Sequence, residues 1–200
     1  MRLQRLLIIH GFNSSPGSMK AQLTMAYFDK HFPHIKVHAP QLKSSPLQAL
    51  QQLQDIIASQ PNAHWYITGS SLGGFFATYL SEQYGHKAVL INPAVRPFEL
   101  LQDVIGEQTN PYTNETYHVL PQHMQQLQDM YQNRIDANNY MVMVQTGDEV
   151  LDYRQAVEKY QHSHLIVQQG GDHSFIDFEK MLPVIVKFFQ LENNGHSERA

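Results

Sequence analysis

The sequence contains no cysteine, and this absence removes several kinds of chemistry at once. A chain without cysteine forms no disulfide bonds, carries no thiolate nucleophile and offers no thiolate ligand to a metal ion. Positive charge is also scarce: 14 lysines and arginines stand against 18 aspartates and glutamates, so the formal net charge is −4. The chain therefore lacks the usual electrostatic basis for binding nucleic acid or an anionic membrane.

Long hydrophobic runs are missing as well. Two arginines precede the apolar run Leu6–Ile9, as in a signal peptide, but four residues are too few for its hydrophobic region and no small-residue cleavage site follows. No other stretch approaches the length of a membrane-spanning helix. We therefore expect a soluble, cytoplasmic protein that binds neither nucleic acid nor membrane.

What the sequence does contain is a regular alternation of strand-like and helix-like segments. Apolar runs predict six strands, over 3–10, 35–39, 63–68, 87–92, 139–146 and 163–169. Helical spacing predicts helices over 18–31, 45–59, 71–84, about 152–160 and about 174–190. This alternation predicts an α/β fold in which helices cover both faces of a mostly parallel sheet. Such a sheet binds its ligand beyond the carboxyl ends of its strands.

The length of 200 residues suits one domain, which we assign to 1–192, with a polar tail at 193–200. The alternation is interrupted once, by an insert over about 94–138. Helical stretches are expected at 97–106 and 120–132, joined by the polar loop "GEQTNPYTNETY". A connection this long inside a compact domain is usually functional.

The segment Gly69-Ser70-Ser71-Leu72-Gly73 follows one predicted strand and opens the next helix. It matches G-x-S-x-G, the turn that exposes a nucleophilic serine, with Ser71 at its centre. Residues two before and two after that serine must lack bulk so that strand and helix approach closely. Only Ser71 has glycine at both places, since Ser70 is flanked by Thr68 and Leu72.

Three other interpretations of this glycine-rich segment are a phosphate-binding loop, a dinucleotide-binding loop and a turn without chemistry. A phosphate-binding loop requires Lys-Ser or Lys-Thr after its last glycine, where this chain has Phe75-Phe76. The dinucleotide-binding pattern G-x-G-x-x-G fails because Ser71 stands at its second glycine. A strand–helix turn without chemistry remains the simplest alternative.

A nucleophilic serine needs a base, and histidine is the side chain that titrates near neutral pH. After a turn of this kind, the acid and then the histidine follow the serine along the chain. His173 has the expected place, because it follows the sixth strand and Gly170-Gly171 and precedes the last helix. His162 and His164 lie at the start of that strand, at the opposite edge of the sheet.

Three acidic residues follow the fifth strand, namely Asp148, Glu149 and Asp152. We assign Asp148 as the acid, whose carboxylate accepts the Nδ1 hydrogen of His173 and stabilises the imidazolium. Asp152 is better explained as the N-cap of the next helix. Asp172 is expected to be a charge at the rim of the site.

The backbone N–H groups of Leu72 and Phe12 are the expected oxyanion hole. Leu72 follows the serine and begins a helix, while Phe12 lies in the loop after the first strand. His10, at the end of that strand, is expected to be structural and to bond to loop backbone.

His31, His34 and His38 have a spacing that is compatible with metal ligation. However, Pro33 and a change of secondary structure separate them, so surface histidines are the better interpretation. We expect no metal ion and no cofactor.

Six segments together make the chain resemble an α/β-hydrolase, and in particular the small bacterial esterases of the YqiA type. They are "HGFNSSP", "GSSLGG", "NPAVRPFELL", "NPYTNETY", "TGDEVLDYRQAV" and "GGDHSF". The resemblance extends over nearly the whole sequence, and "NPAVRPFELL" and "NPYT" are its narrower features. It implies a serine esterase that acts on carboxylic or acyl thioesters, with Ser71, Asp148 and His173 as the catalytic triad.

The resemblance also implies a minimal sheet with the strand order 2-1-3-4-5-6 and a lid formed by the insert. Apolar residues of the insert then either line an acyl pocket or belong to the ordinary core; these are Phe98, Leu100, Leu101, Val104, Ile105, Leu120, Met124, Leu127 and Met130. Arg96 either meets an anionic group of the substrate or pairs with Glu99 or Asp103, and pairing is the better interpretation. Alternatives for the activity are an acyl-CoA thioesterase, a lipase, a peptidase, or a non-catalytic binding protein with the same fold.

Overall fold

A six-stranded parallel sheet forms the centre of the computed structural model, which describes residues 3–192. The polar tail assigned to 193–200 lies outside the described residues. The strands are β1 (Gln4–Ile9), β2 (Lys36–His38), β3 (His64–Ser70), β4 (Lys87–Ile91), β7 (Tyr140–Gln145) and β8 (His164–Gln168). They pair in parallel in the order β2-β1-β3-β4-β7-β8, which confirms the predicted arrangement.

Each face of the sheet is covered by helices because successive strand residues point to opposite faces. In β1, Leu6 and Ile8 pack on one face under α1 (Met19–His31) and α7 (Leu182–Phe189). Leu7 and Ile9 pack on the other face under α2 (Pro46–Ala58), α3 (Leu72–Tyr84) and α6 (Tyr153–Lys159). The strands read as nearly continuous apolar runs because both faces are buried.

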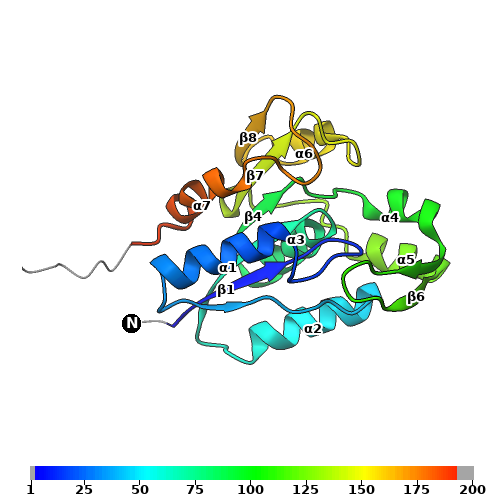
Figure 1. Cartoon of the computed structure of the whole chain (residues 1–200), viewed down its shortest axis with the longest axis horizontal. Coiled ribbons are helices and arrows are strands. Elements are labelled where there is room, and N and C mark those ends of the chain that lie inside the picture. Colours follow the sequence, from blue (N-terminus) through cyan, green and yellow to red (C-terminus); the bar gives the residue numbers. More distant parts are fainter. Residues whose placement is uncertain (1–2, 193–200) are drawn as a thin grey trace, which may run out of the picture.

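The insert gathers beyond the arrowhead of β1, where it is coloured green in Figure 1. It comprises α4 (Pro97–Leu100), a 3-10 helix (Leu101–Val104), β5 (Gly106–Thr109), β6 (Thr116–Val119), α5 (Pro121–Asp129) and a 3-10 helix (Ala137–Asn139). The loop expected over 106–117 was wrong, because β5 and β6 form an antiparallel hairpin. β5 has no apolar side chain, and the alternation in β6 extends over only four residues, Thr116 to Val119, so the sequence pattern is too short to predict the two strands.

The last helix is shorter than the sequence predicts. A 3-10 helix (Phe178–Met181) precedes α7, which begins at Leu182 rather than near residue 174. Phe175 and Asp177 have φ angles of 67° and 61°, in the left-handed region that a right-handed helix cannot include. The apolar spacing continues through this turn because Phe175 and Phe178 are both buried in the core.

The connection from β3 to α3 depends on glycine. A Cβ atom on Gly73 would lie 2.1 Å from the carbonyl oxygen of Ile9, so α3 passes against the backbone of β1 with no room for a side chain. A Cβ atom on Gly69 would lie 2.3 Å from the carbonyl oxygen of Gly73. Both contacts are with backbone, which cannot turn aside as a flexible side chain can.

We predict that Gly73→Ala lowers the free energy of unfolding by about 3 kcal/mol or more, because the added methyl group forces β1 and α3 apart. Chemical denaturation measures this loss. Gly17→Ala is the matched control, since a Cβ atom there meets only the Ser15 hydroxyl, at 3.1 Å. Equal stability of the two variants would contradict the assigned packing.

Candidate active site

The carboxyl ends of the parallel strands lie side by side, because the strand register aligns them. Ile9 of β1 pairs with Gly69 of β3, and Ser70 of β3 pairs with Ile91 of β4. On the other side, Gln145 of β7 pairs with Gln168 of β8. The loops that carry the candidate residues therefore leave the sheet along the same edge.

Ser71 occupies the single-residue corner between β3 and α3. Its φ and ψ angles are 54° and −120°, a strained conformation for a residue with a side chain. Backbone hydrogen bonds stabilise the corner: the Ser71 N–H donates to Ile91 at 3.1 Å, and its carbonyl accepts from Gly74 and Ala94. The strain is therefore compensated by β4 and by the first turn of α3.

Asp148 and His173 lie together, as the sequence predicts. His173 Nδ1 is 2.8 Å from Asp148 Oδ2 and 3.0 Å from Oδ1. The side chain of Asp148 is 2% exposed and that of His173 is 25% exposed, so the carboxylate is held in the interior while the ring reaches the surface of the site. A carboxylate at Nδ1 fixes the ring proton there and leaves Nε2 as the acceptor.

The environment of Asp148 favours its ionised form. Burial raises the pKa of this carboxyl group. The hydrogen bond from His173 and those from the backbone N–H groups of Leu151 and Val150 lower the pKa by more than burial raises it, so the net shift is downward from 3.8. Those two amides donate to Oδ1 at 2.8 Å and 2.9 Å. A buried carboxylate with three donors remains charged at neutral pH.

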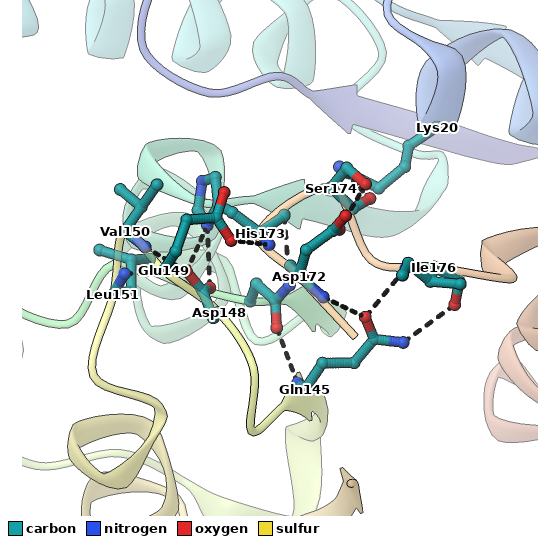
Figure 2. A network of polar contacts seen from close by, with 11 residues as sticks. Lys20, Gln145, Asp148, Glu149, Val150, Leu151, Asp172, His173, Ser174 and Ile176 are labelled. Carbon is teal, nitrogen blue, oxygen red and sulfur yellow. Dashed lines mark hydrogen bonds and ion pairs between the residues drawn. The ribbon is translucent and has the colours of Figure 1, made fainter. Parts of the chain in front are cut away.

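The buried side chain of Gln145 fixes the loop that carries His173 (Figure 2). Its Oε1 atom accepts from the backbone N–H groups of Asp172, at 3.1 Å, and Ile176, at 2.9 Å. Its Nε2 atom donates to Gln168 and to the carbonyl of Ile176, both at 2.9 Å. All the hydrogen-bonding capacity of this amide is used to connect β7, β8 and the histidine loop.

Asn92, at the end of β4, makes a second connection to the same loop. Its Nδ2 atom donates to the carbonyls of Asp172 and His173, at 3.0 Å and 3.2 Å. Its Oδ1 atom accepts from the backbone N–H of Gln145 at 3.0 Å. Asn92 is buried and has a φ of 39°, which asparagine tolerates better than most residues.

Two charged side chains also hold the histidine loop (Figure 2). Glu149 accepts from the backbone N–H of His173 at 3.0 Å. Lys20, on α1, donates to the carbonyl of Ser174 at 2.9 Å. Burial lowers the pKa of Lys20, although Asp172 and Asp148 partly oppose that shift. Both flanks of His173 are therefore attached to other elements.

The backbone N–H groups of Phe12 and Leu72 flank Ser71 from two elements. Leu72 begins α3, and Phe12 follows Gly11, whose Cβ position would lie 3.2 Å from Ser71 Cβ. Among residues 3–192, neither N–H group donates a hydrogen bond within the protein. Two free amides beside a serine are an arrangement that can bind an oxyanion.

Ser71 and His173 line one cavity of about 390 Å³, together with Gly11, Phe12 and Lys20. Within the part of the chain that the structure describes, the Ser71 hydroxyl makes no hydrogen bond, so it is not joined directly to His173. Hydrogen bonds between a nucleophile and its base often form fully only when substrate is bound. The structure thus brings Asp148 to His173 and opens Ser71 and His173 to a common space.

The remaining predicted side chains lie as follows. His10 is buried, and its ring contacts the carbonyl of Gly11 through Nδ1 and the N–H of Leu42 through Nε2, which confirms a structural role. Asp152 caps α6 by accepting from the N–H of Arg154 at 3.0 Å. Arg96 pairs with Glu99 at 3.3 Å on the surface.

The three histidines considered as metal ligands are not gathered in one site. His38 packs against the ring of Trp65 with centroids 5.0 Å apart, so it was wrongly placed among surface histidines. Across residues 3–192, no group of three or more histidine, aspartate or glutamate side chains is placed to hold a metal ion. No helix in that same range is both long and apolar enough to span a membrane.

Gln145 and Asn92 were missed as site residues because nothing in their local sequence distinguishes them from ordinary strand ends. The only signal is their position, since each is a polar amide at the carboxyl end of a buried apolar strand. A polar side chain buried there must find hydrogen-bond partners, and the neighbouring loops supply them.

This arrangement defines the fold of the α/β hydrolases: a parallel sheet of this order, a serine at a strained strand–helix corner, and an acid and a histidine on later loops. The chain has that fold. Residues 5–190 match the model of the uncharacterised protein family UPF0227, and the chain belongs to this family.

Comparisons with individual proteins agree with this placement. A UPF0227 protein from Serratia proteamaculans is 22% identical over 185 residues, which cover 92% of this chain and 97% of that protein. The structure of alpha/beta hydrolase domain-containing protein 10 from mouse is similar with a TM-score of 0.71 at 15% identity, over 93% of this chain and 89% of that one. Est1E from Butyrivibrio proteoclasticus gives a TM-score of 0.70 at 13% identity, over 94% and 88%.

We predict that Gln145→Met lowers the free energy of unfolding by about 1–3 kcal/mol, because the backbone N–H groups of Asp172 and Ile176 lose their acceptor. Chemical denaturation measures the loss. Gln128→Met, the same change at an exposed position of α5, serves as the control. A loss of similar size at both positions would show that Gln145 does not fix the loop.

We predict that Asp148 stabilises the fold only where it is ionised. Since its pKa is lowered in the folded protein, this contribution is present above the ordinary value of 3.8 and disappears as the pH falls below it through the folded pKa. The measurement is the free energy of unfolding of the wild type minus that of Asp148→Asn between pH 3 and 6. A difference that does not shrink toward pH 3 would refute the ionised assignment.

Proposed function

We propose that the chain is a cofactor-free serine hydrolase that cleaves carboxylic or acyl thioesters, with Ser71, His173 and Asp148 as its catalytic residues. The observation that carries the proposal is the Asp148–His173 hydrogen bond of 2.8 Å at the rim of a cavity that also contains the strained Ser71. A serine, a base and a group that orients the base are the three parts of an activated nucleophile, and their presence around one cavity supports the proposal.

In the proposed reaction, Ser71 Oγ attacks the carbonyl carbon while His173 Nε2 takes its proton. The carbonyl oxygen becomes an oxyanion that accepts from the N–H groups of Phe12 and Leu72. When the tetrahedral intermediate collapses, His173 gives the proton to the departing alcohol or thiol. Water then attacks the acyl-enzyme, with His173 as base again, and releases the acid and the free serine.

We assign the acyl group to a second cavity of about 50 Å³ beneath the insert. This cavity shares Gly11 and Phe12 with the cavity of Ser71 and has Leu72 in its wall, so it adjoins the proposed oxyanion hole. Its apolar walls come from α2, α3 and the insert; they include Ala49, Phe76, Leu101, Val119 and Met124. With about 10–15 Å³ for each water-sized group, the volume favours short acyl chains.

Other apolar residues of the insert have different surroundings. Leu127 and Met130 are buried in the core and Phe98 packs against it, while Leu100, Ile105 and Leu120 are exposed. The sequence leaves two possibilities for these residues, an acyl pocket or the ordinary core, and each possibility applies to some of them. Leu101 and Met124 are the insert residues that support an acyl pocket.

We predict that Ser71→Ala lowers kcat for p-nitrophenyl butyrate by about 10³-fold or more, because the nucleophile is gone. Ser70→Ala, the neighbouring control, retains most of the activity since this hydroxyl takes no part in the chemistry. Labelling by a fluorophosphonate tests the same point, because only an activated serine reacts. Labelling of Ser71→Ala at the wild-type rate would reject the assignment, and no labelling of the wild type would favour a non-catalytic binding protein.

A further inference from the structure

The cavity beneath the insert contains one buried polar side chain whose donor has no partner. His123, on α5, is 6% exposed and lines this cavity. Its Nδ1 atom accepts from the backbone N–H of Leu120 at 3.2 Å. Since Nδ1 accepts, the ring proton lies on Nε2, and among the described residues nothing accepts a hydrogen bond from that N–H group.

Lys43, Ser44 and Glu115 also border this cavity, but they are exposed to solvent, and the less exposed polar side chains around it are already occupied within the protein. Tyr117 donates to Asn13 at 2.6 Å, and Asn110 donates to the carbonyl of Ser14 at 2.9 Å. Gln41 also donates to the carbonyl of Ser14, at 3.1 Å. His10 uses both ring nitrogens. His123 is thus the buried polar side chain of this wall with unused hydrogen-bonding capacity.

His123 Nε2 is not among the fully buried polar atoms that lack a partner, so this donor is accessible and can bind water or an oxygen atom of a ligand. Binding pockets commonly combine apolar walls with a few polar groups that fix the orientation of the ligand. The walls formed by Leu72, Phe76 and Met124, with His123 beside them, have this composition. Burial lowers the pKa of His123, so at neutral pH the ring is an uncharged donor. An uncharged donor suits an uncharged oxygen rather than a carboxylate.

We propose that His123 is a specificity-determining residue, whose Nε2–H donates a hydrogen bond to a neutral oxygen on the acyl chain. The expected substrates are short esters or thioesters whose acyl group carries a keto or ether oxygen beyond the scissile carbonyl. This inference rests on the proposed function, because it assigns the cavity beneath the insert to the acyl group. A site built to bind an oxygen discriminates against the hydrocarbon analogue, which leaves the donor unpaired.

The test compares kcat/KM for two pairs of p-nitrophenyl esters with equal numbers of non-hydrogen atoms. The first pair is the 4-oxopentanoate and the 4-methylpentanoate, and the second is the 3-methoxypropanoate and the pentanoate. After correction for spontaneous hydrolysis, we expect the wild type to favour the oxygen-containing ester about tenfold in at least one pair. No preference in either pair would overturn the proposal.

Variants then assign the preference to His123. His123→Phe keeps an aromatic ring but has no donor, so the ratio within the pair falls toward one. His123→Gln keeps an acceptor and a donor and restores part of the ratio. His118→Phe is the matched control, since His118 lies on β6 of the same insert with an exposed side chain. A ratio that survives in a folded His123→Phe variant would refute the role of His123.

A binding measurement keeps this test separate from that of the proposed function. The ¹⁵N resonances of the His123 imidazole are followed in Ser71→Ala during titration with 4-oxopentanoate methyl ester or 4-methylpentanoate methyl ester. We expect the Nε2–H signal to shift with the first compound and not with the second. If the wild type shows neither hydrolysis nor fluorophosphonate labelling, the shift of the His123 Nε2–H signal still tests whether the cavity binds the oxygen-containing ester. Equal shifts with both esters would overturn the proposal.

Discussion

Backbone lies directly on backbone where α3 leaves β3, and the rest of the site depends on this close approach. The absent side chains of Gly69 and Gly73 let α3 begin against the carbonyl of Ile9, at the end of β1. The same approach places Gly11 beside Ser71, so that the loop after β1 and the first turn of α3 flank one point. The sheet, the corner at Ser71 and the segments that carry the proposed oxyanion donors are therefore parts of a single packing arrangement.

The histidine side of the site is fixed in a different way, by neutral amides. Asn92 and Gln145 contribute hydrogen bonds from the ends of β4 and β7 without adding charge near Asp148. A charged side chain at either position would change the electrostatic potential at the Asp148 carboxylate and at His173. Because the amides of Asn92 and Gln145 are neutral, they fix the positions of Asp148 and His173 without adding a net charge that would change the electrostatic potential at either group. The two charges that do attach to this loop, Glu149 and Lys20, are of opposite sign.

The sequence predicts most of the fold because six apolar strands alternate with helices, and chain order then assigns Asp148 and His173 to one edge of the sheet. It predicts Ser71 because the corner tolerates bulk at neither Gly69 nor Gly73. The hairpin β5–β6 could not be predicted, since β5 has no apolar side chain and the alternation in β6 extends over only four residues. Asn92 and Gln145 were missed for a related reason. Their importance comes from partners far away in the chain, and a single polar residue has no periodicity.

The insert is attached to the rest of the molecule at the loop that carries the Phe12 amide. Tyr117 of β6 bonds to Asn13, and Asn110 bonds to Ser14, so the hairpin holds both residues that follow Phe12. A rigid outward swing of the hairpin would break these bonds and release the loop. Opening of the proposed acyl cavity would then also displace the proposed oxyanion donor at Phe12, so water that enters on opening would reach a site without its full set of donors.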